Sequence, residues 1–216
     1  MTFAEVQAGA AQRMLRIVAA YHPGPDPALP EGTGTLLMLG PHEPEFWPAF
    51  TRSPEYTDGA ADPMDRWSAR VIGAWAEAIG AVPLFPFGGP PFLPFIRWAR
   101  DSGWVHASPV GLLVHASEGL FLSFRGALAM RDRLDLPPPP PSPCEICVTR
   151  PCLTACPVGA LGGEGGYDVP RCKTFLRGPG NLSCMQGGCI VRLACPANRP
   201  HGRVPAHSAF HMHHFL

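Results

Sequence analysis

The sequence lacks an excess of charge of either sign, because 17 lysines and arginines balance 17 aspartates and glutamates in 216 residues. Nucleic-acid-binding proteins usually carry a clear basic excess, so we expect no nucleic-acid partner.

Long apolar runs are also lacking. The longest, such as Leu36–Leu39 and Val110–Val114, are far too short to cross a bilayer, and we expect no membrane partner. The first residues contain no basic segment followed by an apolar one, so we predict no secretory signal and a cytoplasmic location.

Several motifs of common enzyme classes are missing as well. The sequence contains no Gly-x-x-x-x-Gly-Lys loop for phosphates, and no dinucleotide fingerprint follows a predicted strand. No Ser-His-Asp set occurs with a nucleophile elbow. Glycine and proline are abundant, at 24 and 28 residues, so the regular elements must be short or separated by long turns.

The first part of the chain predicts a mixed α+β domain. Thr2 and Glu5 form a capping box for a first helix. Its apolar residues at helical spacing are Val6, Ala10, Met14, Ile17 and Val18. Thr35–Leu39 predicts a short buried strand, and Val82–Phe87 predicts an edge strand, because its two prolines cannot donate to a ladder.

A second helix is the clearest of the predicted elements. Asp62 is a suitable N-cap, Pro63 takes the first helical position and Gly80 follows the end. The predicted core face consists of Met64, Trp67, Val71, Trp75, Ala78 and Ile79. A third helix is predicted over 92–102. The strands 111–115 and 120–129 are predicted to form a hairpin around a turn at 116–119.

Five consecutive prolines, Pro137–Pro141, mark the main boundary in the chain, because such a tract is extended and stiff. All eight cysteines follow it. The predicted organisation is an α+β domain at 1–136, a cysteine module at 142–200 and a histidine-rich tail at 201–216.

The cysteines form two groups. The first group reads Cys144-x2-Cys147-x4-Cys152-x3-Cys156-Pro, and the second comprises Cys172, Cys184, Cys189 and Cys195, the last again followed by proline. In two-cluster ferredoxins, the cysteine before a proline ligates the other cluster. We therefore predict crossed ligation of two [4Fe–4S] clusters. Cys144, Cys147, Cys152 and Cys195 would hold one cluster, and Cys172, Cys184, Cys189 and Cys156 the other.

Other interpretations of the cysteines are weaker. Two four-cysteine zinc sites would each need two spaced pairs, and Cys-x3-Cys-Pro is not typical of them. Disulfides conflict with a reducing compartment. In the tail, His207 and His211 lie one helical turn apart and His214 follows. A metal site there is one interpretation, but a solvated or partner-packed tail is favoured, because no carboxylate follows His201 to support histidine ligands.

The cysteine module resembles that of the epoxyqueuosine reductases. The similarity lies in the 144–161 stretch with its Cys-Pro-Val-Gly-Ala-Leu, in Tyr167–Cys172, and in Cys189 followed by Cys195-Pro. Upstream, residues 99–104 and 111–114 are similar to that family's Gly-Leu-Gly-Trp and Gly-Leu-Leu-Ile stretches. Residues 115–126, with Phe124-Arg125-Gly126, resemble the family of B12-processing enzymes (cyanocobalamin decyanase and dealkylase).

These resemblances imply a nitroreductase-like N-terminal domain and a bacterial ferredoxin-like C-terminal module. They imply a reductase in which the clusters pass electrons to a cobalamin or flavin-like cofactor, with Arg125 in the cofactor pocket and an electron-donor protein as partner. The Gly-Arg-Asp-Tyr-His motif of the epoxyqueuosine reductases is not recoverable here, and zero net charge makes tRNA a poor substrate. Two alternatives stay open: an electron carrier without catalysis, and a zinc-stabilised interaction protein.

Overall fold

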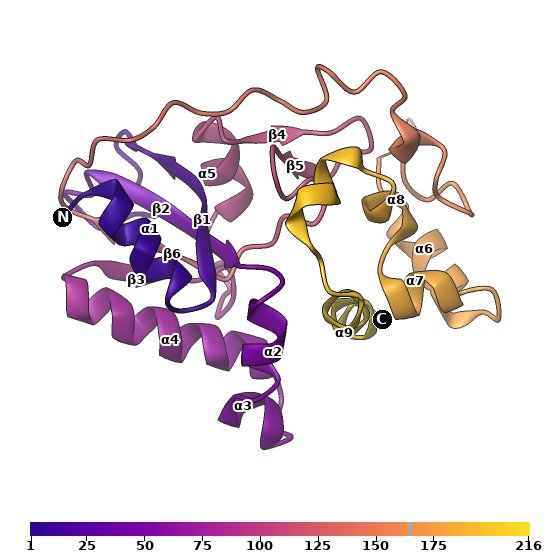
Figure 1. Ribbon diagram of the computed structural model, residues 1–216, viewed down its shortest axis with the longest axis horizontal. Helices are drawn as coiled ribbons and strands as arrows, with labels where there is room; N and C mark the ends of the chain where they lie inside the picture. Colours follow the sequence, from indigo (N-terminus) through magenta and orange to yellow (C-terminus); the bar gives the residue numbers. More distant parts are fainter. Residues whose placement is uncertain (164–165) are drawn as a thin grey trace. The chain divides into compact units, whose positions relative to one another are not determined.

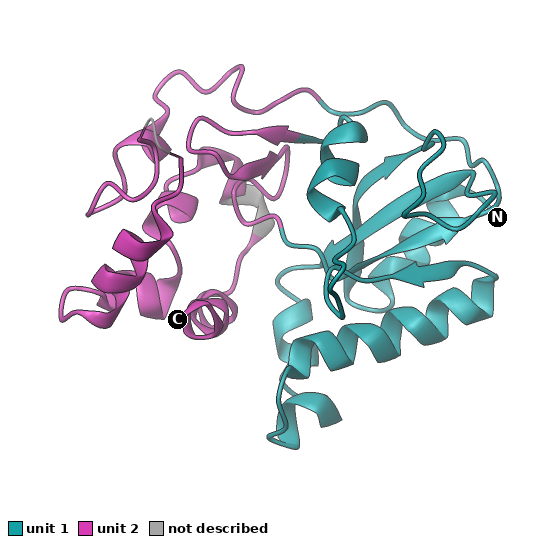
Figure 2. Cartoon of the chain, turned by 180° about the vertical axis from the view of Figure 1, so that it is seen from behind, with its two compact units in different colours: residues 1–105, 123–140 teal, residues 106–122, 141–216 magenta. Residues whose placement is uncertain are grey.

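The computed structural model of the chain describes residues 1–163 and 166–216, with the side chains of all these residues except 199–201. The chain divides into two compact units. Residues 1–105 and 123–140 form the first unit, and residues 106–122 and 141–216 form the second (Figure 2). The predicted scheme of 1–136, 142–200 and 201–216 assigns residues 106–122 to the N-terminal domain, whereas the structure groups them with the cysteines.

The first unit is built on a four-stranded antiparallel sheet with strand order β1-β2-β6-β3 (Figure 1). The strands are β1 (Leu15–Tyr21), β2 (Thr35–Pro41), β3 (Val82–Leu84) and β6 (Gly126–Met130). Every residue of β2 and β6 is buried. The predicted strand at 35–39 is confirmed. Strand β3 is shorter than the predicted 82–87, but it lies at the edge of the sheet, as Pro83 favours. Together with the helices below, the molecule is therefore of the mixed α+β class.

Five helices accompany this sheet in the described part of the first unit: α1 (Phe3–Ala11), α2 (Phe46–Phe50), α3 (Pro54–Thr57), α4 (Pro63–Ile79) and α5 (Phe95–Asp101). Helix α4 runs alongside β3 and β6 (Figure 1) and begins and ends where predicted. Trp67 and Trp75 on its core face are each 4% exposed, and Ile72 is fully buried. Ala78, which was predicted to share that face, is exposed, because the face follows Ile72 and Ala76 instead.

The first helix is shorter than predicted. The capping box of Thr2 and Glu5 is present, but α1 ends at Ala11, and Leu15–Tyr21 is strand β1. Met14 has a φ of 57°, which a helix interior does not allow. The Ile17–Ala20 run pairs with β2, so burial of both faces in the sheet decides the conformation over the helical spacing.

The second unit consists of short elements. Strands β4 (Val105–Ala107) and β5 (Leu113–His115) form a two-stranded sheet. The helices are η1 (Pro151–Leu153), α6 (Val169–Arg177), α7 (Leu182–Gly187), α8 (Ile190–Leu193), η2 (Pro196–His201) and α9 (Pro205–Phe215).

The hairpin predicted over 111–129 is wrong. Residues 116–119 do form a turn, in which His115 and Gly119 exchange two backbone hydrogen bonds of 3.0 Å. However, β5 pairs with β4 and belongs to the second unit, whereas β6 pairs with β2 and β3 in the first. The reason is the burial of Val110, Val114 and Leu120, which pack in one apolar cluster with Leu161 and Val191 of the second unit.

Candidate metal centres

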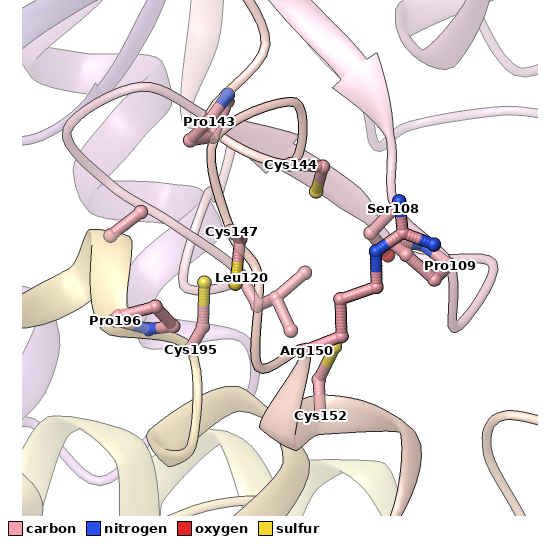
Figure 3. Close-up of a pocket in the computed structure, with 11 residues that line it drawn as sticks. Ser108, Pro109, Leu120, Pro143, Cys144, Cys147, Arg150, Cys152, Cys195 and Pro196 are labelled. Carbon is pink, nitrogen blue, oxygen red and sulfur yellow. The ribbon is translucent and has the colours of Figure 1, made fainter.

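Four cysteines surround one pocket in the second unit. Cys144, Cys147, Cys152 and Cys195 are four of the eleven residues that line it (Figure 3). Cys144 and Cys147 lie in the loop after the polyproline tract, Cys152 lies on η1, and Cys195 is the N-cap of η2. The pocket therefore joins a residue at the end of the cysteine module to three residues at its beginning.

The segment 106–122 supplies the rest of the pocket wall. Ser108, Pro109 and Leu120 line it, and Leu120 is 1% exposed. The main chain of Leu120 is held on both sides: its N–H donates to Asn198 Oδ1 (2.9 Å), and its carbonyl accepts a hydrogen bond from the Arg192 guanidinium. These bonds tie the segment to the residues that flank Cys195.

The other four cysteines form a second set. Cys172 lies on α6, Cys184 on α7, and Cys189 is the N-cap of α8. The pKa values of Cys172 and Cys184 are raised, first by burial and then by neighbouring thiolates, which in both cases include Cys189 and Cys156. Cys156 is thus an electrostatic neighbour of Cys172 and Cys184, and the Ala160 N–H donates to its sulfur at 3.2 Å.

The first set shows the same mutual electrostatics. Burial, followed by the charge of neighbouring thiolates, raises the pKa of Cys144 and of Cys152, and in both cases the foremost neighbour is Cys195. Mutual repulsion of this kind keeps the free thiols protonated, so that binding of a positively charged inorganic group releases protons. Cys195 is therefore an electrostatic neighbour of both Cys144 and Cys152.

The two sets share an apolar surrounding. Cys152 and Cys195 belong to the cluster of Leu120, Leu161 and Val191, and Cys156 and Cys189 of the second set pack against the same cluster. Such a surrounding keeps water from the sulfurs and lowers the local dielectric. One continuous apolar region thus borders both candidate sites.

The candidate ligands are thiol sulfurs, which both zinc and iron–sulfur clusters accept. All eight cysteines are free thiols. Over residues 1–163 and 166–216, no set of three or more His, Cys, Asp or Glu side chains is arranged to hold one metal ion. The first set instead lines a pocket. Ser108 lines the same pocket, and its hydroxyl oxygen is buried and has no hydrogen-bond partner among the described residues. A group that accepts hydrogen bonds would satisfy it.

Two polar side chains beside the second set were not predicted. The Tyr167 hydroxyl is hydrogen-bonded to Cys172, which together with burial raises the pKa of the tyrosine. Arg192 is half-buried, and desolvation lowers its pKa, while the nearby Cys189 favours the charged form. Tyr167 lies in the stretch that carries the family resemblance, and this could have singled it out; no sequence signal pointed to Arg192, Asn198 or Ser108.

Arg125 directly precedes β6 in the first unit. Its side chain is 12% exposed, and its Nη1 lies 3.7 Å from Asp65 Oδ1. Its Nε has no hydrogen-bond partner among the described residues. Burial lowers the pKa of Arg125, and the charge of Asp65 opposes this shift.

The histidine-rich tail is the helix α9, which packs on α7. His207 is fully buried and its Nε2 lies 3.0 Å from Nε2 of His211. Phe215 stacks on Tyr167 with ring centroids 6.2 Å apart. The sequence favours a solvated or partner-packed tail, whereas the structure packs one face of α9 within the chain, with Met212 and Phe215 beside Cys172 and Cys184.

Comparison with models of known protein families, with curated proteins and with solved structures gives no match. In the part of the chain that the structure describes, no helix has the length and apolar character needed to cross a membrane.

Proposed function

We propose that this protein is an iron–sulfur redox protein whose second unit binds two [4Fe–4S] clusters. The observation that carries the proposal is the arrangement of the thiols in two sets of four. Cys195 lies with Cys144, Cys147 and Cys152 around one pocket. Cys156 in turn neighbours the later cysteines. This exchange of the cysteines that precede a proline is the arrangement of two-cluster ferredoxins.

Each set supplies more than ligands to its cluster. Backbone N–H groups near the sulfurs, such as that of Ala160 at Cys156, stabilise negative charge on them. The shared apolar cluster around Leu120 and Val191 keeps both sites dry. When bound, the clusters accept and release single electrons; the chain itself sets their surroundings and their separation.

We further propose that the clusters serve a reductase, with an electron-donor protein as partner and a corrinoid or flavin-like cofactor in the first unit. The resemblance of 115–126 to the B12-processing family and of the cysteine module to the epoxyqueuosine reductases supports this proposal. Arg125 is the residue proposed to contact the cofactor. Its Nε is buried without a hydrogen-bond partner among the described residues, and an anionic or carbonyl group of a cofactor would satisfy it. The nitroreductase-like fold of that unit is part of this proposal.

A second candidate function is that of an electron carrier in which the first unit only docks a partner. The ion pair between Arg125 and Asp65 favours it, because a structural arginine needs no cofactor. A zinc-stabilised interaction protein is a third and weaker candidate.

The test begins with anaerobic purification and analysis of iron, acid-labile sulfide and zinc. The proposal expects a brown protein with two clusters, each reducible by one electron. Zinc in place of iron would refute the redox function. Addition of cobalamin, monitored for a base-off spectral shift, and extraction of bound flavin then separate the reductase from the carrier, which would show neither.

Crossed ligation has its own test in single variants. Cys195→Ala should abolish the same cluster signal as Cys144→Ala, and Cys156→Ala the same signal as Cys172→Ala. If Cys195→Ala instead abolished the signal that Cys172→Ala abolishes, the clusters would be held by sequential groups and the crossing would be wrong.

A further inference from the structure

Ser108 is a buried polar residue beside the first thiol set, and it is not one of the proposed cluster ligands. Its side chain is 7% exposed and lines the pocket of Cys144, Cys147, Cys152 and Cys195 (Figure 3). Its Oγ has no hydrogen-bond partner among the described residues. A buried hydroxyl without a partner is unfavourable, so the site predicts an acceptor inside the pocket.

The main chain of Ser108 is already fully engaged. Its N–H donates to the Leu112 carbonyl (2.9 Å), and its carbonyl accepts from the Gly111 N–H (3.0 Å). The turn at 108–112 is therefore fixed by its own hydrogen bonds. Farther along the same segment, Leu120 is anchored by Asn198 and Arg192. The hydroxyl is the remaining hydrogen-bonding group of Ser108, and it sits on a wall that is held in place.

On the basis of the proposed function, we propose that the Ser108 hydroxyl donates a hydrogen bond to a sulfur of the first cluster and thereby raises the reduction potential of that cluster. One-electron reduction adds negative charge to the sulfurs, and a hydrogen bond to an acceptor strengthens as the acceptor becomes more negative. The electron comes from the donor protein or a chemical reductant, and the serine keeps its proton. Ser108 is thus a positioning residue that favours the reduced state, and it does not ligate iron.

The expected effect is confined to one cluster. Ser108 lines the pocket of the first set, whereas the second set has its own hydroxyl, that of Tyr167, beside Cys172. Replacement of Ser108 should therefore shift the reduction potential of the first cluster and leave that of the second cluster unchanged. The second cluster serves as an internal reference for any general effect on the fold.

The experiment is an anaerobic potentiometric titration with dithionite, followed by electron paramagnetic resonance, on the wild type and on Ser108→Ala. The reduction step that is missing in Cys144→Ala identifies the first cluster. At the potential where this cluster is half reduced in the wild type, Ser108→Ala should raise the ratio of oxidised to reduced cluster by up to about tenfold, equivalent to 59 mV for one electron. Ser102→Ala is the matched control, because Ser102 is also 7% exposed but lies in the first unit and donates to the Ala99 carbonyl.

A second pair of variants tests the proposal if Ser108→Ala does not fold. Thr and Val have nearly the same shape and differ in the hydroxyl, so Ser108→Thr should keep the wild-type potential and Ser108→Val should lower it or lose the first cluster alone. Equal potentials in this pair, or an equal shift of both clusters, would overturn the proposal. Absence of iron from the wild type would instead refute the proposed function, so the two failures are distinguishable.

Discussion

Replacement of Gly119 by alanine tests the attachment of the 106–122 segment to the cysteine unit. Gly119 has a φ of +54°, and an added Cβ would lie 1.9 Å from Asn198 Oδ1 and 2.8 Å from the Asn198 backbone N. Rotation of the asparagine side chain alone does not relieve this clash, because the backbone is also too close. The residues that flank Cys195 and the loop after β5 must therefore move apart.

The magnitude follows from two contributions. A non-glycine residue in the left-handed region costs about 1–2 kcal/mol. Separation of Asn198 from Leu120 breaks their 2.9 Å hydrogen bond and leaves a buried N–H without a partner, which costs a further 1–3 kcal/mol or so. We expect Gly119→Ala to lower the free energy of unfolding by about 3 kcal/mol, a large part of the stability of a small domain.

The assay is equilibrium urea unfolding under argon, with Gly111→Ala as the control. Gly111 lies in the same segment and has a φ of +76°, but an added Cβ would meet no atom within 4 Å. The control should therefore show only the backbone cost. We also expect Gly119→Ala to lose the first cluster preferentially, because Cys195 is displaced. If the two variants were equally stable and equally loaded, the attachment described here would be refuted.

Three further predictions concern other parts of the molecule. Hydrogen bonds from Arg70 lower the pKa of Glu55 from its usual 4.5 to about 2, so Glu55→Gln should cost about 1 kcal/mol at pH 7. That difference in urea unfolding should be complete above pH 4.5 and vanish as the pH falls to about 2, and a difference that persisted there would contradict the ion pair. Ile72→Ala, at a fully buried position, should cost about 3 kcal/mol by the same assay, and a loss below 1 kcal/mol or so would exclude a core position. Phe215→Ala removes the stacking on Tyr167 and should destabilise α9 by about 1–2 kcal/mol, visible as faster amide exchange in that helix alone; unchanged exchange would refute its docking role.

Sequence reasoning succeeded where one local pattern and one tertiary role agreed. Helix α4 has a proline at its first turn, a glycine after its end and a regular apolar face, so its bounds could be read directly. Sequence reasoning failed where the spacing of the apolar residues fits both a helix and a strand. The Ile17–Ala20 run suits a helix or a buried strand, and only pairing with β2 selects the strand.

The candidate site could also be predicted only in part. Cysteine spacing and the prolines after Cys156 and Cys195 are local signals, and they sufficed to propose the two sets. The wall of the first pocket could not be predicted, because Ser108 reaches it through the burial of Val110 and Leu120 among residues distant in sequence. No periodicity encodes such a contact.

The proposed exchange of Cys156 and Cys195 between the sets also has a consequence for cluster assembly. A ribosome releases Cys144, Cys147 and Cys152 long before Cys195, so the first set stays one ligand short until nearly the whole unit has emerged. The second set is completed by Cys189, which precedes Cys195 by only six residues. Under the proposed ligation, both sets are therefore completed at nearly the same point of synthesis, although three ligands of the first set are made much earlier.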